Sequence, residues 1–359
     1  MGRVSVVILN YGATIDELRT CVASVTGAEG GVVSQIVLVD NGSPVNSTAA
    51  DDVAAELSIV TCPVRVVRHD RNLGFAGGVN SALPSCHTEL VFLLNNDATV
   101  EPKAIGEAVR VLDASHDPAV LGVACKMLIT DAVDSAERVI DSVGMAVNPA
   151  AEAFNIGLGQ PDLGQYDADG APSFGPCFGA GLFRRRAFEP NAVGLLHDHY
   201  FLYYEDVEWN WRANLLGFSF VAAPRAVVHH RMSSSTRHLG YDFKFRLIER
   251  NLLLTAAELC TPRRALSIWA RRGLGLARGA VTGRHYPVAS LRALSGAFFH
   301  LPRTLRRRRS LQARRVRSDE QLFAFSAGER TFYDGVAYAP IERAAARRFA
   351  ELALGRRPQ

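Results

Sequence analysis

Apolar runs of strand length alternate with helical patterns over the first 112 residues of this 359-residue chain, and this alternation constrains the fold most strongly. Four such runs occur, at residues 3–10, 35–40, 64–68 and 90–94. Helical spacing is found over residues 15–25, 76–83 and 101–112. Strands that alternate with helices predict an α/β fold, in which a mostly parallel sheet is flanked by helices.

Each of the four runs ends in a cluster of polar, turn-forming residues. The clusters are Asn10-Tyr11-Gly12, Asp40-Asn41-Gly42-Ser43, Asp70-Arg71-Asn72 and Asn95-Asn96-Asp97. One such cluster alone would be an ordinary turn. Ligands of open α/β sheets bind just beyond the carboxyl ends of the strands, where these four clusters should converge. We therefore predict a nucleotide-binding cleft at this edge of the sheet.

Three of these clusters offer specific contacts to a nucleotide diphosphate. Asp97, flanked by two amides, suits Mg²⁺ or Mn²⁺, because both ions prefer hard oxygen ligands. Asp40 could accept the imide N–H of a pyrimidine base, or form a turn with Gly42. The loop from Asn72 to Gly74 could bring backbone N–H groups to a phosphate, or serve as a tight turn before a helix. Each alternative stays open at this point.

The second half of the chain carries another acidic cluster. Short strands are expected over residues 120–145 and a long loop over 149–176, followed by a glycine-rich segment at Gly179-Ala180-Gly181 that lets the backbone pass close to a ligand. Residues 205–216 show helical spacing and end at Gly217. Acids in a first turn favour any helix. In the sharper interpretation, Asp206 is a general base beside the glycine-rich segment.

Two further features follow from this helix. Arg212 lies four residues after Glu208 and could pair with it. Two short strands, expected at residues 218–223 and 226–229, lead into His229 and His230. A histidine at a strand end is commonly structural, but a neutral imidazole is also an acceptable ligand for a metal ion held by Asp97.

The composition bounds the cellular setting. The six cysteines form no CxxC pair, which argues against a zinc site and favours a reducing compartment. We find neither a signal peptide nor an apolar run of 18 residues, so a cytoplasmic protein without a transmembrane helix is expected. A hydrophobic content of 48% supports a large core, enough for one large domain with an appendage or for two domains.

The net charge of +4 conceals a strong asymmetry. Residues 261–317 contain fifteen Arg and no Asp, Glu or Lys, so the rest of the chain is acidic. Such a segment could lie on an anionic membrane surface, bind nucleic acid, or pack as helices with a solvated Arg face. No nucleic-acid motif accompanies the charge, so no nucleic-acid partner is expected. Aromatic residues after Asp319 suggest packing on the body of the protein or on a second subunit, as in a homodimer.

Taken in order, these motifs resemble those of the family-2 inverting glycosyltransferases with the GT-A (Rossmann-like) fold, and within them the bacterial rhamnosyltransferase-like branch. The resemblance extends from about Val4 to Leu259. Besides the clusters above, it includes Gly77-Gly78-Val79-Asn80, Phe201-Leu202-Tyr203-Tyr204-Glu205-Asp206-Val207-Glu208, and His230 followed by Ser233 and Ser235. It implies a GT-A domain over residues 1–259, with a nucleotide-binding half (1–112) and an acceptor half (113–259). A basic helical C-terminal region would cover residues 260–359.

The resemblance implies transfer of a sugar from a nucleotide diphosphate to an acceptor hydroxyl, with inversion. Asn95-Asn96-Asp97 stands where the family has its DxD motif, so Asp97 and His230 are the implied metal ligands, with an amide in place of the first acid. Asp206 is the implied base of the Glu205-Asp206 pair. The implied donor-binding residues are Asn10, Tyr11, Asp40, Arg71, Asn72, Gly74, Asn95 and Asn96. The implied acceptor-binding residues are Gly179, Ala180, Gly181 and Glu208.

The branch favours dTDP-L-rhamnose as donor and a polyprenyl-linked or glycan acceptor, in cell-envelope polysaccharide synthesis at the inner face of the plasma membrane. A UDP- or GDP-linked sugar is the alternative donor. A nucleotidyltransferase should carry a basic phosphate-binding motif near its first strand, which Asn10-Tyr11-Gly12 lacks. A non-catalytic sugar-nucleotide-binding protein is the second alternative, and the presence of both Asp97 and Asp206 argues against it.

Overall fold

The structure, a computed structural model, describes residues 2–44, 48–58, 62–130, 138–231, 240–282 and 286–324. Its centre is a mixed sheet in which the strand order is β10-β12-β6-β11-β4-β1-β2-β3. The strands of this path are β1 (Val4–Asn10), β2 (Val33–Asp40), β3 (Val64–Arg68), β4 (Leu90–Asn95), β6 (Val120–Ile129), β10 (Pro172–Ser173), β11 (Ala180–Arg184) and β12 (Ser219–His230). The four strands β4, β1, β2 and β3 are all parallel, which confirms the predicted α/β class.

Helices cover both faces of the sheet because successive strand residues point to opposite sides. Helices α1 (Ile15–Thr26), α2 (Ala49–Leu57) and α4 (Ala104–Ala114) pack on the face to which Val6 and Ile8 point. Helices α3 (Gly74–Ala82) and α5 (Glu205–Leu215) pack on the opposite face, against Val7. Both faces of β1 are therefore buried, which explains why its sequence is a continuous apolar run rather than an alternating one.

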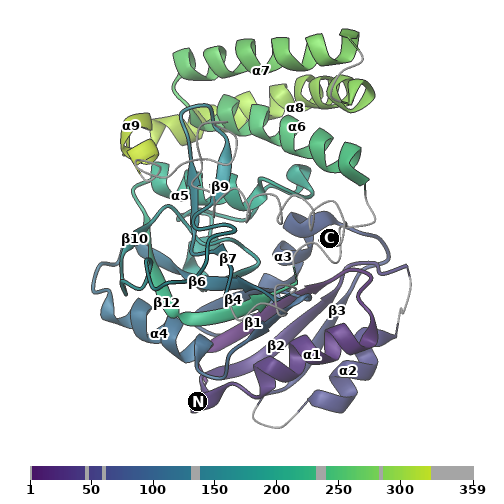
Figure 1. Ribbon diagram of the computed structural model, residues 1–359, viewed down its shortest axis with the longest axis vertical. Coiled ribbons are helices and arrows are strands. Elements are labelled where there is room, and N and C mark those ends of the chain that lie inside the picture. Colours follow the sequence, from purple (N-terminus) through teal and green to yellow (C-terminus); the bar gives the residue numbers. More distant parts are fainter. Residues whose placement is uncertain are drawn as a thin grey trace.

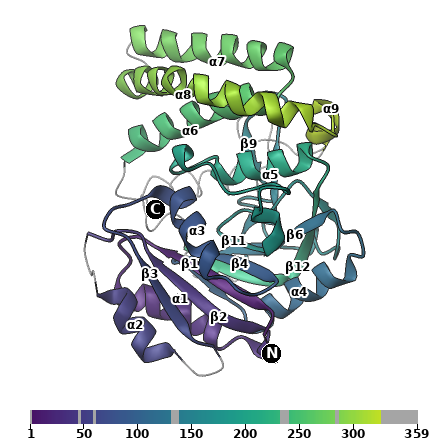
Figure 2. The same cartoon turned by 180° about the vertical axis from the view of Figure 1, so that it is seen from behind.

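A layer of helices lies over α5, on the side away from the sheet (Figures 1 and 2). It consists of α6 (Gly240–Leu259), α7 (Pro262–Thr282), α8 (Pro287–Ala313) and the short α9 (Asp319–Phe323). A cluster of buried side chains joins this layer to α5, including Trp211 of α5, Leu252 of α6 and Phe323 of α9. In the part of the chain that the structure describes, no helix is long and apolar enough to cross a membrane.

The predicted elements agree with the structure in the first half, apart from helix α2, and differ in three places in the second. Residues 120–145 form one ten-residue strand, β6, followed by β7 (Ile140–Ser142) and β8 (Met145–Val147). Every residue of β6 is buried, so its sequence shows no alternation that would reveal its length. The expected loop over 149–176 includes the short strands β9 (Ala153–Asn155) and β10. Helix α2 was not predicted.

The two strands expected between residues 218 and 229 are one strand, β12. Its pairing with β6 shifts register between Ala223 and Val227, which leaves the three intervening residues without ladder partners. Pro224 lies in this bulge, where the lack of a backbone N–H costs no ladder hydrogen bond. Pro224 therefore interrupts the pairing with β6 without ending the strand. Ser233 and Ser235, and the aromatic residues after position 324, lie outside the described residues.

Candidate active site

A cavity of about 460 Å³ opens beyond the carboxyl ends of β1 and β4, at the edge of the sheet where the cleft was predicted. Strand ends, the loop before α3, the segment before β11 and the start of α5 all contribute to its walls. Its lining includes Leu9, Tyr11, Asn41, Asn72, Gly74, Phe75, Asn95, Asn96, Asp97, Cys177, Phe178, Gly179, Phe201, Leu202, Tyr203, Glu205, Asp206, His230 and Phe243. Segments far apart in the sequence thus enclose one site, as expected for a ligand pocket.

One wall of the cavity carries the acid and the histidine that were predicted to hold a metal ion. His230 pairs with Ala98 of β5 (Ala98–Val100) across an antiparallel ladder, which places it beside Asp97. Its Nε2 lies 3.1 Å from Asp97 Oδ1. On the other side of the ring, Nδ1 lies 2.7 Å from Asp141 Oδ2 on β7. His230 is therefore held between two carboxylates.

These carboxylates control the protonation of the ring. Burial by itself would lower the pKa of His230, but hydrogen bonds to Asp141 and then Asp97 outweigh burial and raise the pKa to about 10. Asp141 was not predicted, because it lies in a short strand without a motif, far from His230 in the sequence. His229 points elsewhere, with its Nε2 3.2 Å from Glu101. His230, not His229, therefore faces the cavity.

The donor set fits a divalent cation of the Mg²⁺ or Mn²⁺ type. It offers the Asp97 carboxylate, the His230 imidazole and the amide groups of Asn95 and Asn96 at the same wall. The Asn95 amide nitrogen lies 3.4 Å from His230 Nε2. Asn10 is buried and does not line the cavity; instead, its Oδ1 accepts a hydrogen bond of 2.9 Å from the Asn96 amide. Asn10 therefore orients a lining residue.

Another part of the cavity lining is built by the segment before α5. Phe201, Tyr203 and Tyr204 all have a backbone φ between 64° and 69°, a range that residues other than glycine rarely adopt. The Phe201 carbonyl accepts a hydrogen bond from the Phe75 backbone and lies 2.2 Å from where a Cβ of Gly74 would be. Gly74 is thus required for this close approach, in addition to lining the cavity as predicted.

Glu205 and Asp206 begin α5 at this segment. Burial raises the pKa of Asp206 to about 6, while backbone N–H groups, including that of Val207 at 2.8 Å, partly offset this rise. Burial and then the charge of Asp206 raise the pKa of Glu205 well above its ordinary value. Among the described residues, Glu205 Oε2 has no hydrogen-bond partner. Glu205 is therefore the protonated member of the pair, and Asp206 the one that ionises near neutral pH.

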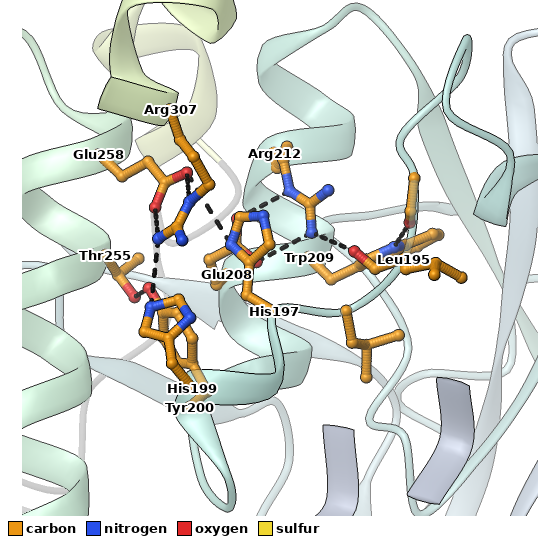
Figure 3. Close-up of polar contacts among 12 residues, drawn as sticks. Leu195, His197, His199, Tyr200, Glu208, Trp209, Arg212, Thr255, Glu258 and Arg307 are labelled. Carbon is orange, nitrogen blue, oxygen red and sulfur yellow. Dashed lines mark hydrogen bonds and ion pairs between the residues drawn. The ribbon is translucent and has the colours of Figure 1, made fainter. Parts of the chain in front are cut away.

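Glu208, predicted to bind the acceptor, does not reach the cavity, and this prediction is wrong. Residues two apart on a helix point in nearly opposite directions, so Asp206 and Glu208 cannot share a site. Glu208 is fully buried, and its two oxygens accept hydrogen bonds of 2.8 and 3.0 Å from Arg212. This confirms the predicted pair with Arg212. Arg212 also donates to the Val193 carbonyl and to the Leu195 carbonyl, the latter drawn in Figure 3.

The Glu208–Arg212 pair lies beside a second pair that comes from the C-terminal layer. Arg307 of α8 donates to both oxygens of Glu258 of α6, at 3.0 and 2.9 Å. His197 stands between the two pairs, with its Nδ1 3.4 Å from Glu208 and 3.9 Å from Glu258 (Figure 3). Burial lowers the pKa of His197 well below its ordinary value, so its ring is neutral. This cluster joins α5 to the helical layer.

Four other predicted contacts lie outside the cavity lining. Asp40 is buried, and its Oδ1 accepts a hydrogen bond of 3.1 Å from the Ser43 backbone, which is the turn considered as an alternative. Arg71 is exposed. Ala180 and Gly181 are buried in β11 between β4 and β6, so only Gly179 of the glycine-rich segment lines the cavity. The contact of Asp40 and Arg71 with a base stays a prediction.

Fold and cavity together define an α/β protein of the GT-A class, with carboxylates, amides and a histidine at the sheet edge. Residues 5–189, more than half of the chain, match the model of the family described as glycosyl transferase family 2. The chain therefore belongs to glycosyl transferase family 2, an inverting glycosyltransferase family whose members take a sugar from a nucleotide sugar. No curated protein matches the chain in sequence.

Solved structures support the same fold. The chain is similar to GalNAc-T7 with UDP, GalNAc and Mn²⁺, at a TM-score of 0.59 and 15% identity over 80% of this chain. It spans about half of that protein, 52% of its length. It is also similar to the mannosyltransferase PcManGT from Pyrobaculum calidifontis with GDP-Man and Mn²⁺ (TM-score 0.50, 18% identity, 93% of this chain and 88% of that one). S. aureus TarS 1–349 with UDP gives a TM-score of 0.50 at 13% identity, over 94% of each chain.

Proposed function

We propose that this glycosyltransferase moves L-rhamnose from dTDP-L-rhamnose, with inversion, to a hydroxyl group of a lipid-linked or polysaccharide acceptor. One observation carries the catalytic part of this proposal: Asp206 lines the same cavity as Asp97 and His230. Inversion requires a base at the acceptor hydroxyl and positive charge at the leaving diphosphate. The cavity holds candidates for both roles on elements that are fixed by the core.

The diphosphate end of the reaction belongs to the wall formed by Asp97, His230 and the two amides. A bound Mg²⁺ or Mn²⁺ would supply Lewis-acid stabilisation of the leaving phosphate oxygens. Asp97 and His230 Nε2 would hold this ion, and its binding would displace the proton that Nε2 carries at neutral pH. Asp141 would fix the orientation of the imidazole through Nδ1. Asn10 holds the Asn96 amide in place, which limits movement of the loop after β4.

Asp206 removes the proton of the acceptor hydroxyl while the oxygen of that hydroxyl attacks the anomeric carbon. A base is most effective when its pKa lies near the working pH, and the pKa of Asp206 is about 6. Glu205 beside it keeps its proton, because ionisation of both buried carboxyls would bring two like charges together. A single carboxylate therefore acts as base, and no covalent sugar–enzyme intermediate is needed.

The donor assignment rests on the motif resemblance to the rhamnosyltransferase-like branch. GalNAc-T7 and TarS were solved with UDP, and PcManGT with GDP-Man, so a UDP- or GDP-linked sugar is the alternative donor. The acceptor we propose is a polyprenyl-linked glycan of the cell envelope. Such an acceptor would place the enzyme at the inner face of the plasma membrane, as a monomer or a homodimer.

A donor panel tests the proposal. Hydrolysis and transfer would be measured for dTDP-rhamnose, UDP-sugars and GDP-sugars, with and without Mn²⁺ or Mg²⁺, together with binding of each free nucleotide diphosphate. We expect dTDP-rhamnose to be selected, and both turnover and metal-dependent binding to be lost in Asp97→Ala. Selection of UDP or GDP would reject the rhamnosyl assignment and keep the mechanism. Absence of any nucleotide binding with metal present would favour a non-catalytic protein.

A further inference from the structure

The exposed apolar side chains of this protein are concentrated on one part of the surface. Of the twelve large apolar side chains that are exposed among the described residues, nine lie on α7, on α8 or at Tyr286, which precedes α8. On α7, Leu274 and Val281 are 72% and 88% exposed, and on α8 Phe299 is 80% exposed. Such a concentration marks an interaction surface rather than the scattered exposure of an ordinary monomer.

These side chains form helical stripes. Leu266, Ala270, Leu274, Ala277 and Val281 recur every three or four residues along the outer face of α7. The inner face of the same helix buries Ile268 and Leu276. Across the helix pair, Phe298 of α8 contacts Trp269 of α7, with ring centroids 5.4 Å apart, so the two helices present adjoining apolar surface. We call the exposed outer sides of α7 and α8 the α7–α8 face.

Fourteen of the fifteen arginines of the basic region lie among the described residues, and they divide into two groups. Seven bond to the rest of the protein, namely Arg264, Arg272, Arg307, Arg308, Arg314, Arg315 and Arg317. Seven others are exposed and form no ion pair with any described residue, namely Arg263, Arg271, Arg278, Arg292, Arg303, Arg306 and Arg309. All seven of the second group lie on α7 and α8. Positive charge without internal partners therefore borders the exposed apolar stripes.

Two of these arginines also line a groove of about 470 Å³ between α6, α7 and α8. Thr282 and Ser290, which carry hydroxyl groups, line the same groove as Arg271 and Arg278. The acidic residue of the groove, Glu249, is already neutralised by two hydrogen bonds from Arg272, at 2.8 and 3.0 Å. The groove thus keeps a net positive charge, which suits a phosphate group.

The combination of apolar and cationic groups identifies the partner. A symmetric contact with a second copy through the same face would bring the same arginines together. Residues 325–359 contain six Arg against four acidic residues, so they do not complement the charge either. A nucleic acid would leave the leucines and phenylalanines in water. An anionic bilayer accepts both kinds of group, because its phosphates pair with Arg and its acyl boundary takes up apolar side chains.

We propose that the α7–α8 face binds the surface of an anionic lipid bilayer. Leu274, Val281 and Phe299 enter the boundary between head groups and acyl chains, while Arg271 and Arg278 bind lipid phosphates in the groove. The helices lie on the membrane and do not cross it. The proposal concerns a surface separate from the catalytic cavity, and it does not depend on the identity of the donor sugar.

Vesicle co-sedimentation of the full chain tests this proposal, without any sugar donor. Vesicles of phosphatidylcholine alone would be compared with vesicles that contain phosphatidylglycerol. We expect binding to the anionic vesicles that weakens with salt. Arg271→Gln/Arg278→Gln should bind about 30-fold more weakly, since each Arg near the surface contributes about fivefold. Leu274→Ser/Phe299→Ser should also bind more weakly. Leu163→Ser, which alters a leucine that is 82% exposed elsewhere, and Arg65→Gln should bind like the native chain.

Three outcomes would overturn the proposal. The first is equal binding to neutral and anionic vesicles, or no binding to either. The second is anionic binding that the four face substitutions leave unchanged, or that the two control substitutions weaken as much. The third is a loss of self-association in the face variants, without any effect on vesicle binding, which would identify a second copy as the partner. Circular dichroism and nucleotide binding show that each variant is folded.

Discussion

Two clusters of buried or half-buried carboxylates meet at helix α5, and they differ in how their charge is balanced. Glu208, with Glu258 beside it, is held by guanidinium groups: Arg212 bonds to one carboxylate and Arg307 to the other (Figure 3). Glu205 and Asp206 form no ion pair with any described residue, and burial raises the pKa of both. The Glu208 carboxylate of this helix therefore stabilises the fold, whereas the Asp206 carboxylate keeps an unbalanced charge available for chemistry.

The cluster of His197, Glu208 and Glu258 could be mistaken for a metal site. His197, Glu208 and Glu258 each offer a ligand atom, and these atoms lie within 4.8 Å of one another. Both carboxylates are already neutralised by two hydrogen bonds from an arginine, so a cation would have to displace a guanidinium. At the cavity, by contrast, Asp97 and Asp141 share a single histidine. The comparison therefore assigns a structural role to the cluster of His197, Glu208 and Glu258, and ligand binding to Asp97 and His230 at the cavity.

The largest expected effect is on the rate of transfer, and it comes from Asp206, whose charge has no paired cation among the described residues. Asp206→Asn removes the proposed base but keeps its shape, so the rate of transfer should fall by about 10²–10⁴-fold or more, while donor affinity stays the same. Steady-state transfer and nucleotide-diphosphate binding, measured on the same preparation, check this expectation. Asp113→Asn, on a carboxylate that pairs with Arg3 at the surface, is the matched control. Full activity in Asp206→Asn would reject Asp206 as the base.

Changes to the Glu208–Arg212 pair should lower the stability of the fold rather than the rate of transfer. Arg212→Ala leaves the buried Glu208 carboxylate without its cation and also removes the hydrogen bonds to Val193 and Leu195. We expect the free energy of unfolding to fall by about 3–5 kcal/mol. Denaturant unfolding measures this loss, and Arg185→Ala, which removes a long surface ion pair with Glu189, should change it by less than about 1 kcal/mol. A variant as stable as the native chain would contradict the structural role.

Asp141→Asn tests the histidine that lies between two carboxylates. Loss of the negative charge at Nδ1 makes His230 a poorer metal ligand, so Mn²⁺ affinity should fall by about 10–100-fold. Titration of Mn²⁺ in the presence of a nucleotide diphosphate measures the change, with Asp16→Asn on an exposed carboxylate as control. Unchanged Mn²⁺ affinity would show that Asp141 does not act on a metal through His230.

How far the sequence could predict these clusters depends on whether their members belong to one segment. Asp97, Asp206 and His230 each follow a strand or begin a helix, so local patterns indicated them, and the structure brings all three to one cavity. Asp141 belongs to no pattern, and its partner His230 is 89 residues away. Glu208 was assigned wrongly because the acidic cluster was treated as one unit, although helical geometry separates residues that are two apart.

The basic region shows the same limit for charge. Composition indicated fifteen arginines without acids, yet seven of the described ones bond to the body of the protein. Several of their partners lie outside the region, such as Glu258 for Arg307 and Glu249 for Arg272. Periodicity alone could not tell which arginines face inward, because α7 has apolar residues on both faces. Only the fold separates the arginines that hold the helical layer from those that face outward.

The smallest effect, and the sharpest contrast with Arg212→Ala, is a gain in stability. Burial raises the pKa of Asp206 to about 6, above the value near 3.9 of an unfolded chain, so the folded state binds the proton more tightly. The sign follows from linkage: the native chain is favoured below pH 4 and loses this contribution as pH rises through 6. Asp206→Asn never ionises, so at pH 7.5 it should be more stable than the native chain by about 1–2 kcal/mol.

Chemical denaturation of both chains between about pH 3 and pH 7.5 measures this difference. We expect the two unfolding free energies to differ by a constant amount below pH 4 and to diverge between pH 4 and pH 6, with the variant gaining on the native chain. A difference that is independent of pH would show that the Asp206 charge is balanced in the folded state. In that case both clusters of α5 would have balanced charges, and the contrast between them would no longer indicate where the chemistry takes place.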